Sequence, residues 1–409
     1  MRKKRLMILT LASVMAISMA GCGSKKEAST TTVTTQNTTE ATTTVTETTE
    51  PETTEPETTE PETTEPETTE PETTEPEVTT ESENTTQSEA ATEATTDNSE
   101  AADAENDANP NGETVDINKY IETTEVDPPL WLVTDPESGN SMYLLGTMHA
   151  LPSGVTGYPA DLMDIYNACD SIAVELDVVS MQNDMGAQMA LIQSMLYDDG
   201  TTIKDHLSED TYEKMKDYFT SVGMYNPLLN QYNVGFWVNL CDELMLTKID
   251  NLELSGTDAY FINKAKEDGK EVIEIETMAI QGNALTAYSD ELADYLLSKS
   301  IDNAGDIEGY AEDLANLYNV WASGSGEIME EVEKLEEDAE ELPEDLKDDE
   351  EAYNKIMLTD RNHGMAEKAS EYLKEGKNCL FMVGAAHYGG EEGVDNLLED
   401  MGYTVEKIE

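Results

Sequence analysis

Short apolar runs with the length of buried strands recur at both ends of residues 113–409. These runs are 131–133, 141–145, 171–177, 271–276, 379–383 and 403–408. Between them, apolar residues recur three and four positions apart, which predicts helices. The predicted helices are 159–168, 181–197, 208–221, 228–248, 258–266, 290–299, 306–322, 350–374 and 391–401. Strands that alternate with helices favour an α/β fold with a central mixed sheet.

Two of the predicted strands end in the same short motif. Gly146 and His149 are the first and fourth residues of Gly-Thr-Met-His, and Gly384 and His387 hold the same places in Gly-Ala-Ala-His. A glycine-containing loop, a helix and a strand follow each motif. We therefore expect two pseudo-repeated units of strand, GxxH motif, helix and strand, with the helical middle of the chain inserted between them.

Residues 1–22 have the pattern of an export signal. Four basic residues lie near the start, an apolar run extends from Leu6 to about Ile17, and Cys22 follows Ala-Gly. This resembles a bacterial lipoprotein signal, with Cys22 as the lipidated residue. The alternative is an ordinary secretory signal that contains a chance cysteine. We expect export and lipid anchoring to the outer face of the cytoplasmic membrane.

Residues 23–112 form an acidic segment that is rich in Thr, Glu and Pro. From 27 to 112 there is no Lys or Arg, and the five-residue repeat Pro-Glu-Thr-Thr-Glu begins at Pro51. A segment with so little to bury is expected to stay disordered and to act as a stalk that holds 113–409 away from the membrane. A neutral repeat without a selected length is the other interpretation.

The folded part is itself strongly acidic. It holds 64 acidic and 17 basic residues, so phosphate backbones are repelled and nucleic acid is an unsuitable partner. Much of this charge lies in 327–351, which we interpret as an acidic insertion of one or two solvated helical segments interrupted at Pro343. The cysteines at 169, 241 and 379 are expected to be buried thiols, with one disulfide left open.

The motif histidines suggest a metal site at the strand ends. Two histidines are too few for a structural zinc site but suit a catalytic one, in which carboxylates complete the ligands. The acidic candidates at other strand ends are Glu175 and either Glu274 or Glu276. Such a mixed set suits Zn, Mn, Co or Fe(II), and the sequence leaves the choice open. A chance GxxH in the core or a loop is the alternative. Of the two other histidines, His206 is expected at the surface, and His363, in a charged helix with no strand before it, is expected outside the site.

The order of the motifs resembles the TraB/GumN family, which includes PrgY-type pheromone-shutdown proteins and Tiki ectodomains. The resemblance covers residues 130–409. The matching segments are 131–132, 143–149, 174–177, 256–258, Phe261, 265–266, 269–270, 275–277, 361–362 with Met365, 383–387, 390–393 and 397–405.

The resemblance implies a Tiki/TraB-like α/β fold, related to the erythromycin-esterase and ChaN-like folds. It implies a metal held by His149 and His387, with Glu175 and Glu276 as acidic partners. Further residues would assist: Arg361 and Asn362 in catalysis, and Thr147, Asp258, Gly146 and Gly384 in the substrate-binding part. The metal would be Mn, Co or Zn.

We expect a metal-dependent peptidase that acts on an extracellular peptide or protein substrate, with Glu175, Glu274 or Glu276 as general base. The rival is a binding protein that sequesters a secreted peptide or pheromone without chemistry. Both need the same pocket, so the sequence alone does not separate them.

Overall fold

A computed structural model of the chain describes residues 114–337 and 341–408. The predicted export signal, Cys22 and the acidic repeat segment lie outside the described residues. Within the described residues, no helix is both long enough and apolar enough to cross a membrane.

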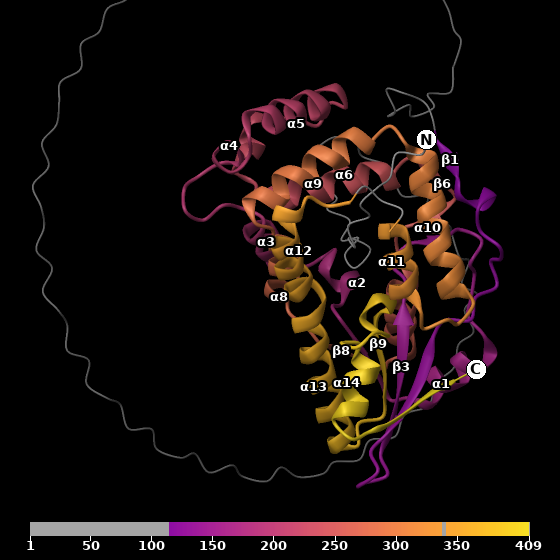
Figure 1. Cartoon of the computed structure of the whole chain (residues 1–409). Coiled ribbons are helices and arrows are strands. Elements are labelled where there is room, and N and C mark those ends of the chain that lie inside the picture. The colour runs from indigo at the N-terminus through magenta and orange to yellow at the C-terminus, as the bar shows by residue number, and fades with distance from the viewer. Residues whose placement is uncertain (1–113, 338–340, 409) are drawn as a thin grey trace, which may run out of the picture. The chain divides into compact units, whose positions relative to one another are not determined.

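A six-stranded mixed sheet forms the centre of the fold (Figure 1). Its order is β10 (Thr404–Ile408), β2 (Leu130–Thr134), β3 (Ser141–Thr147), β9 (Cys379–Gly384), β5 (Ser171–Val174) and β8 (Glu271–Glu274). The last four strands are parallel, whereas β2 pairs antiparallel with both β3 and β10. The predicted α/β class with a central mixed sheet is confirmed. The four parallel strands end at the same edge, so the residues that follow them lie close together.

Alternate residues of the strands enter separate cores on the two faces of the sheet, as the two-residue period of a strand requires. In β9, Phe381 lies in one core and Met382 in the other. Helices α13 (Asp360–Glu375) and α14 (Val394–Asp400) cover the first face. Helices α1 (Ala160–Ala168) and α7 (Gly256–Asp268) cover the second. The central strands are therefore buried on both sides and read as continuous apolar runs.

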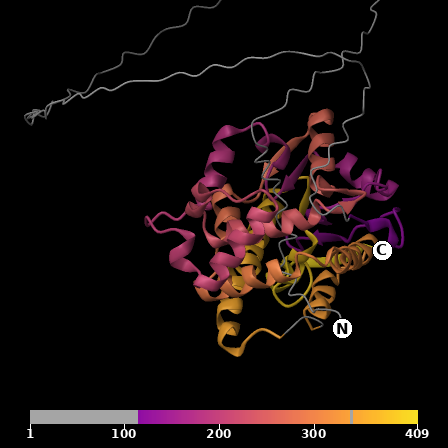
Figure 2. The same cartoon turned by 90° about the horizontal axis from the view of Figure 1, so that it is seen from above.

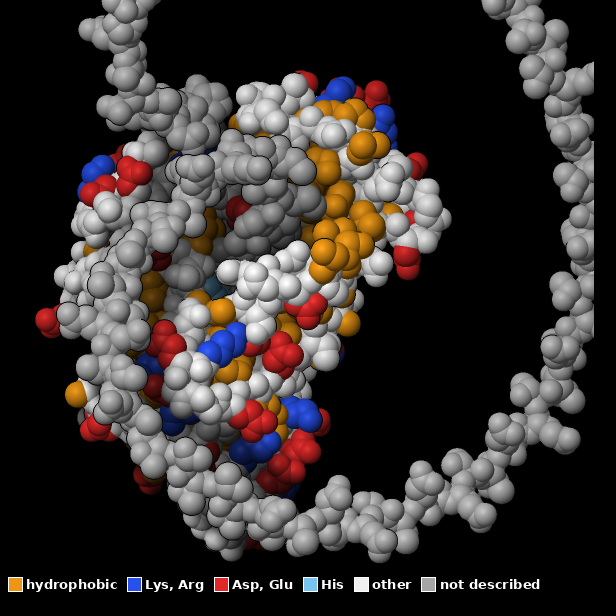
Figure 3. Space-filling view, turned by 180° about the vertical axis from the view of Figure 1, so that it is seen from behind, with side chains coloured by type: hydrophobic (Ala, Val, Ile, Leu, Met, Phe, Trp, Pro, Cys, Tyr) orange, Lys and Arg blue, Asp and Glu red, His pale blue; other side chains and the backbone are white. Residues whose placement is uncertain are grey.

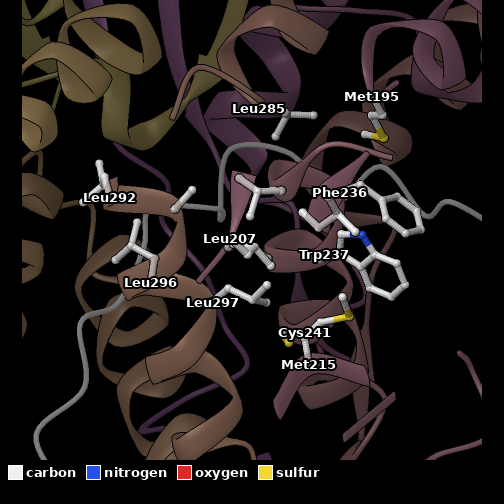
Figure 4. Packing of buried hydrophobic residues seen from close by; sticks show 14 of the residues in the cluster. Met195, Leu207, Met215, Phe236, Trp237, Cys241, Leu285, Leu292, Leu296 and Leu297 are labelled. Carbon is white, nitrogen blue, oxygen red and sulfur yellow. The ribbon is translucent and has the colours of Figure 1, made fainter. Parts of the chain in front are cut away.

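The middle of the chain builds a helical part with its own core. In Figure 1 the arrowhead of β3 points toward this part, and Figure 2 shows the helices spread out when the molecule is seen from above. Its main helices are α3 (Met185–Ser194), α5 (Glu209–Ser221), α6 (Val234–Leu246), α8 (Met278–Ala284) and α9 (Asp290–Asn303), with shorter α2 (Val178–Met181) and α4 (Ile203–His206). Trp237 of α6 is fully buried, and Figure 4 shows it among apolar side chains of this core.

A further core lies around α10 (Ile307–Ala322), where Trp321 is fully buried. The indole of Trp321 donates a hydrogen bond to the Gly146 carbonyl at 2.9 Å, which ties α10 to the end of β3. The remaining elements are β1 (Val115–Asp116), η2 (Ile117–Lys119), β4 (Leu151–Pro152), η3 (Pro227–Gln231), β6 (Ile249–Asp250), β7 (Leu252–Glu253), α11 (Ile328–Glu337), η4 (Glu344–Leu346), α12 (Lys347–Asn354), η5 (Lys355–Thr359) and η6 (Ala385–His387).

Several predicted helices have different limits in the structure. The predicted helix 181–197 is shorter in the structure and forms α3, because α2 ends at Met181 and the Asp184 side chain caps a new helix by accepting from the Gly186 and Ala187 amides. The predicted helix 228–248 begins with the separate turn η3, and Asn233 then caps α6. The sequence pattern did not indicate α8, whose residues are uncharged and without clear periodicity.

The acidic segment 327–351 is helical on both sides of Pro343, as α11 and α12. It is not only solvated, however. Ile328 and Val332 of α11 are buried in the core around α10, and Leu346 is buried in the helical part. Helix α11 also contacts η6, the turn that ends in His387. These apolar side chains therefore anchor the segment, while Glu327, Glu330, Glu344 and Asp345 are exposed.

Candidate functional site

The predicted site residues follow the ends of the four parallel strands. His149 comes two residues after β3, His387 three after β9, Glu175 directly after β5 and Glu276 two after β8. Because adjacent parallel strands end at one edge, these four side chains share one region of the molecule. Figure 3 shows a histidine side chain inside a hollow on the rear face of the molecule.

The first motif is held in place by the start of α7. The Thr257 amide donates to the Met148 carbonyl at 2.8 Å, and the Met148 amide donates to the Thr257 hydroxyl at 3.3 Å. Gly256 has φ of +56°, and a Cβ there would lie 2.5 Å from the His149 Cα. Only glycine therefore permits this close approach of the helix to the motif.

Asp258 then orients the histidine of that motif. Its Oδ2 lies 2.8 Å from His149 Nδ1, and its Oδ1 accepts from the Thr147 hydroxyl at 3.1 Å. Burial lowers the pKa of His149, but Asp258, and then Glu175, outweigh it and raise the pKa to about 9. The carboxylate thus holds the ring by Nδ1 and directs Nε2 away from itself.

The second motif histidine is held by an amide instead of a carboxylate. His387 Nδ1 lies 2.6 Å from Asn362 Oδ1, and Asn362 Nδ2 donates to the Glu392 carbonyl at 2.7 Å. This second bond assigns the amide oxygen to the histidine, so Nδ1 carries the proton and Nε2 carries a free lone pair. His387 is fully buried, and burial, followed by Arg361, holds its pKa well below the usual value. The ring is therefore neutral.

The two carboxylates are joined by Arg361, whose side chain is 3% exposed. Its Nε and Nη2 donate to the two oxygens of Glu276 at 2.8 Å each, and Nη2 also donates to Glu175 Oε2 at 2.6 Å. Gln281 Nε2 donates to both carboxylates at 2.9 Å. Burial lowers the pKa of Arg361, but Glu175 and Glu276 together raise it by more than burial lowers it, so the guanidinium stays charged. These contacts engage both oxygens of Glu276.

The position of Arg361 depends on an irregular turn in its own helix. The π-helical turn η5 precedes α13, and Arg361 Nη1 donates to the carbonyl of Met357 in that turn at 3.2 Å. A π turn changes the rotation of the residues that follow it, and such turns are frequent at functional sites. The turn and this hydrogen bond direct the guanidinium toward the strand ends.

The space beside Gly384 is where the histidines and Glu175 meet. A Cβ on Gly384 would lie 3.4 Å from Glu175 Oε1, 3.5 Å from His149 Nε2 and 3.6 Å from His387 Cδ2. Glu175 Oε1 also accepts from the Gly384 amide at 2.7 Å and lies 3.8 Å from His387 Nε2. Glycine at this position therefore keeps open the space between the three groups.

Both Nε2 atoms in this space are buried and have no hydrogen-bond partner among the described residues. A buried polar atom without a partner is costly, and the pattern of a histidine held by Nδ1 with Nε2 free is that of a metal ligand. His149 and His387 are therefore of the type that ligates metal ions, and Glu175 Oε1 is the nearest carboxylate oxygen. Glu276 is not available as a ligand, because Arg361 takes both of its oxygens. As the side chains stand in residues 114–337 and 341–408, however, no three His, Cys, Asp or Glu residues are arranged to hold a metal ion.

Comparison with known protein families matches residues 129–407 to one family model. The chain belongs to the TraB/PrgY/gumN family. No match was found among the curated proteins, and none was found among the solved structures. The matched range contains all the site residues described above, which we call the strand-end cluster. The cluster therefore lies within the family's own domain.

Most of the residues predicted from the sequence are brought together in this TraB/PrgY/gumN domain. The cluster unites His149, His387, Glu175, Glu276, Arg361, Asn362, Asp258, Thr147 and Gly384. Gly146 lies outside it, because its carbonyl accepts from the Trp321 indole and a Cβ there would meet Pro129 and Ala385. Glu274 lies outside it: this residue is exposed, and its side chain accepts from the Asp177 amide at 2.9 Å.

The other histidines and the cysteines are also outside the cluster. His363 is half exposed and lies 2.9 Å from Glu392 Oε2, whereas His206 lies between Asp290 and Thr201 in the helical part. Cys169, Cys241 and Cys379 are buried free thiols.

The sequence reasoning missed Gln281, which is buried and contacts both carboxylates. The available signal was weak, since a single glutamine in an uncharged helix resembles a surface residue. Only the pairing of β8 beside β5 shows that α8 begins over Glu175 and Glu276. The Gln281 side-chain amide is thus a further hydrogen-bond donor to Glu175 and Glu276, in addition to Arg361.

Proposed function

We propose that this TraB/PrgY/gumN protein is a metal-dependent peptidase that acts on an extracellular peptide. The observation that carries the proposal is the pair of buried, unpartnered Nε2 atoms of His149 and His387 beside Glu175 Oε1. A divalent ion bound there would supply Lewis acidity toward a peptide carbonyl and a water molecule. Mn, Co and Zn all suit such ligands.

The protein's own residues would prepare the site in defined ways. Asp258 and Asn362 hold the two rings by Nδ1 and so present both Nε2 atoms to one space. Arg361 and Gln281 hold Glu175 and Glu276, and the Gly384 amide holds the remaining Glu175 oxygen. Glu175 is the nearer candidate for general base, and Glu276 would position Arg361.

One observation favours the rival function, capture of a secreted peptide without cleavage. Each oxygen of Glu175 and of Glu276 already accepts at least one hydrogen bond from Arg361, Gln281 or the Gly384 amide. The Oε2 atoms of both acids accept two hydrogen bonds each, so one of these must break before either Oε2 atom can accept a proton from water. If the Oε1 atoms do not reach a water molecule either, the site would bind a ligand and not hydrolyse it.

Metal analysis tests whether His149 and His387 bind a metal ion. Full-length protein equilibrated with Mn, Co or Zn should hold about one ion per chain, and Co should give a d–d absorption spectrum that reports histidine ligation. H149A and H387A should lose both signals. H363A replaces the half-exposed histidine and is the matched control. Equal metal content in all four proteins would refute the metal site.

A cleavage assay then separates the two functions. Metal-loaded protein is incubated with a peptide library, and the products are identified by mass spectrometry. New termini that disappear with H149A and with E175Q would support the peptidase. Peptides that are retained intact by metal-loaded protein would instead support the binding protein.

Two further parts of the proposal concern the whole chain. We propose export and lipid attachment at Cys22, with residues 23–112 as a stalk. Labelling with a fatty-acid probe should mark wild type and not C22S, and C22S should leave the membrane fraction. Unchanged fractionation would refute the anchor.

We also propose that β3–α1–β5 and β9–α14–β10 are pseudo-repeated units of a Tiki/TraB-like fold. Each has a strand, a GxxH motif, a helix and a strand, and α1 and α14 cover opposite faces of the sheet. A crystal structure in which the units superpose with their histidines coincident would support this. Superposition that separates the histidines would contradict it.

A further inference from the structure

The turn that carries His387 has contacts with two helices. Asn362 of α13 binds His387 Nδ1 and also donates to the Glu392 carbonyl beyond the turn. Helix α11 contacts η6 itself, directly after β9 (Figure 1). Hydrogen bonds from α13 and packing from α11 therefore both act on the position of this histidine. We call residues 324–332, which are the loop before α11 and the first half of α11, the α11 segment.

Apolar side chains of α11 share a core with residues of both GxxH motifs. Ile328 and Val332 are buried and lie four residues apart, so they are on the same face of α11. The core that contains them also contains Ala385 of the second motif and Met148 of the first. Displacement of this face of α11 would therefore remove packing from the motifs.

The loop before α11 packs against the residues that follow His387. Tyr388 is fully buried, and its ring stacks on that of Trp131 with the ring centroids 4.5 Å apart. A Cβ on Gly326 would lie 2.9 Å from Trp131 Cζ2, so the loop touches this ring pair. A Cβ on Gly389 would lie 2.8 Å from the Gly326 carbonyl oxygen, so the loop also touches the backbone after the turn. The α11 segment therefore contacts the chain on both sides of His387.

The position of the turn decides whether His387 keeps its bond to Asn362. The two atoms of that bond are 2.6 Å apart, and a hydrogen bond weakens steeply when one partner moves or turns. The same bond sets the proton on Nδ1 and leaves the lone pair on Nε2. A turn that lost its packing against α11 would therefore let the ring change its tautomer as well as its direction.

We propose that the α11 segment positions His387 in the strand-end cluster, through its packing against η6 and against the Trp131–Tyr388 pair. The acidic segment 327–351, which the sequence presents as a solvated insertion, thus contributes positioning residues to the site. The inference rests on the proposed function only in taking His387 to be a site residue. It does not depend on which ion or peptide is bound.

Histidine NMR of the full-length protein in EDTA tests the position of His387 directly. The chain contains only four histidines, so a sample with isotope-labelled histidine gives few imidazole signals, and H387A assigns those of His387. In wild type these signals should show a neutral ring with the proton on Nδ1. I328A removes a buried side chain from α11. It should give a mixture of both tautomers at His387, because the bond to Asn362 is weakened.

L346A is the matched control, because Leu346 belongs to the same acidic segment but is buried in the helical part. Ile328 and Leu346 are 7% and 8% exposed, so both variants lose an aliphatic side chain of equal size at equal burial. Both should unfold at lower urea concentration than wild type, but only I328A should change the His387 signals. Unchanged His387 signals in I328A, or the same change in L346A, would overturn the proposal.

G326A tests the loop by adding a methyl group, and it decides the question if I328A does not fold. The new Cβ would meet Trp131 at 2.9 Å, so the loop or the ring must move. G326A should therefore change the His387 signals as I328A does. G305A is its control, because a Cβ on Gly305 meets nothing within 4 Å. A wild-type His387 spectrum in G326A would contradict the proposal.

Cobalt binding separates this proposal from the proposed function. Cobalt should bind about tenfold more weakly to I328A than to wild type or L346A, because a displaced ligand lowers metal affinity. If wild type binds no metal, the peptidase is refuted, while altered His387 signals in I328A and G326A still support the positioning role. If wild type and I328A bind cobalt equally well, the metal site stands and the positioning role is refuted.

Discussion

Replacing Arg361 with methionine should destabilise this domain more than any surface change. The side chain donates to both carboxylates and to the Met357 carbonyl, and all three charged groups are at most 6% exposed. Removing one partner of a buried ion pair costs about 3–5 kcal/mol, because the charge that remains is uncompensated. Here two like charges remain together, so we expect a loss of about 5 kcal/mol in the free energy of unfolding at pH 7.

The size of this loss can be checked against a compensating variant. The variant E175Q/E276Q/R361M removes all three charges of this buried group and should regain about 3 kcal/mol at pH 7. R361K keeps the charge without the planar fork and should lie between wild type and R361M.

Urea denaturation followed by tryptophan fluorescence and circular dichroism measures these differences. Trp131, Trp237 and Trp321 are buried in three different cores, so the fluorescence reports global unfolding. The reasoning would be refuted if R361M lost less than about 1 kcal/mol at pH 7. It would also be refuted if E175Q/E276Q/R361M were no more stable than R361M at pH 7.

Three further predictions follow from the same geometry. G384A places a methyl group 3.4–3.6 Å from Glu175 and both histidines, so calorimetry should show weaker metal binding with little change in stability. G256A should destabilise the domain by about 3 kcal/mol or prevent folding, because φ is +56° and the new Cβ meets the His149 backbone at 2.5 Å; urea denaturation measures this. The raised pKa of His149, about 9, stabilises the metal-free protein below pH 6.5, and this contribution of at most roughly 3 kcal/mol should disappear as the pH rises through 9. Thermal melts in EDTA from pH 6 to pH 10 check that sign, and H149A should show a flatter profile.

The strand pattern could be predicted because central parallel strands are buried on both faces. The apolar runs at 141–145 and 379–383 correspond to β3 and β9, and the α/β class follows from their alternation with helices. The helix limits were less predictable, since α3, α6 and η5 are set by capping side chains and by a π turn. These depend on single hydrogen bonds, which apolar periodicity does not record.

The choice between Glu274 and Glu276 shows what only the structure could decide. Both lie within the same predicted run, 271–276, but Glu274 is exposed and accepts from the Asp177 amide, whereas Glu276 is buried and accepts from Arg361. A shift of two residues leaves a side chain on the same face of a strand, so the pattern alone cannot separate them. The bend of the chain after β8 separates them, because it leaves Glu274 exposed and brings Glu276 against Arg361.

The sequence by itself determined the two GxxH motifs, the acids at strand ends and the family to which their order belongs. It could do so because these features are local: a strand, a glycine that turns, and a side chain just beyond. Only the tertiary structure decided that Arg361 and Gln281 hold both carboxylates while His149 and His387 keep unpaired nitrogens. That arrangement joins residues up to about 240 positions apart, and it exists only because β3, β9, β5 and β8 lie side by side.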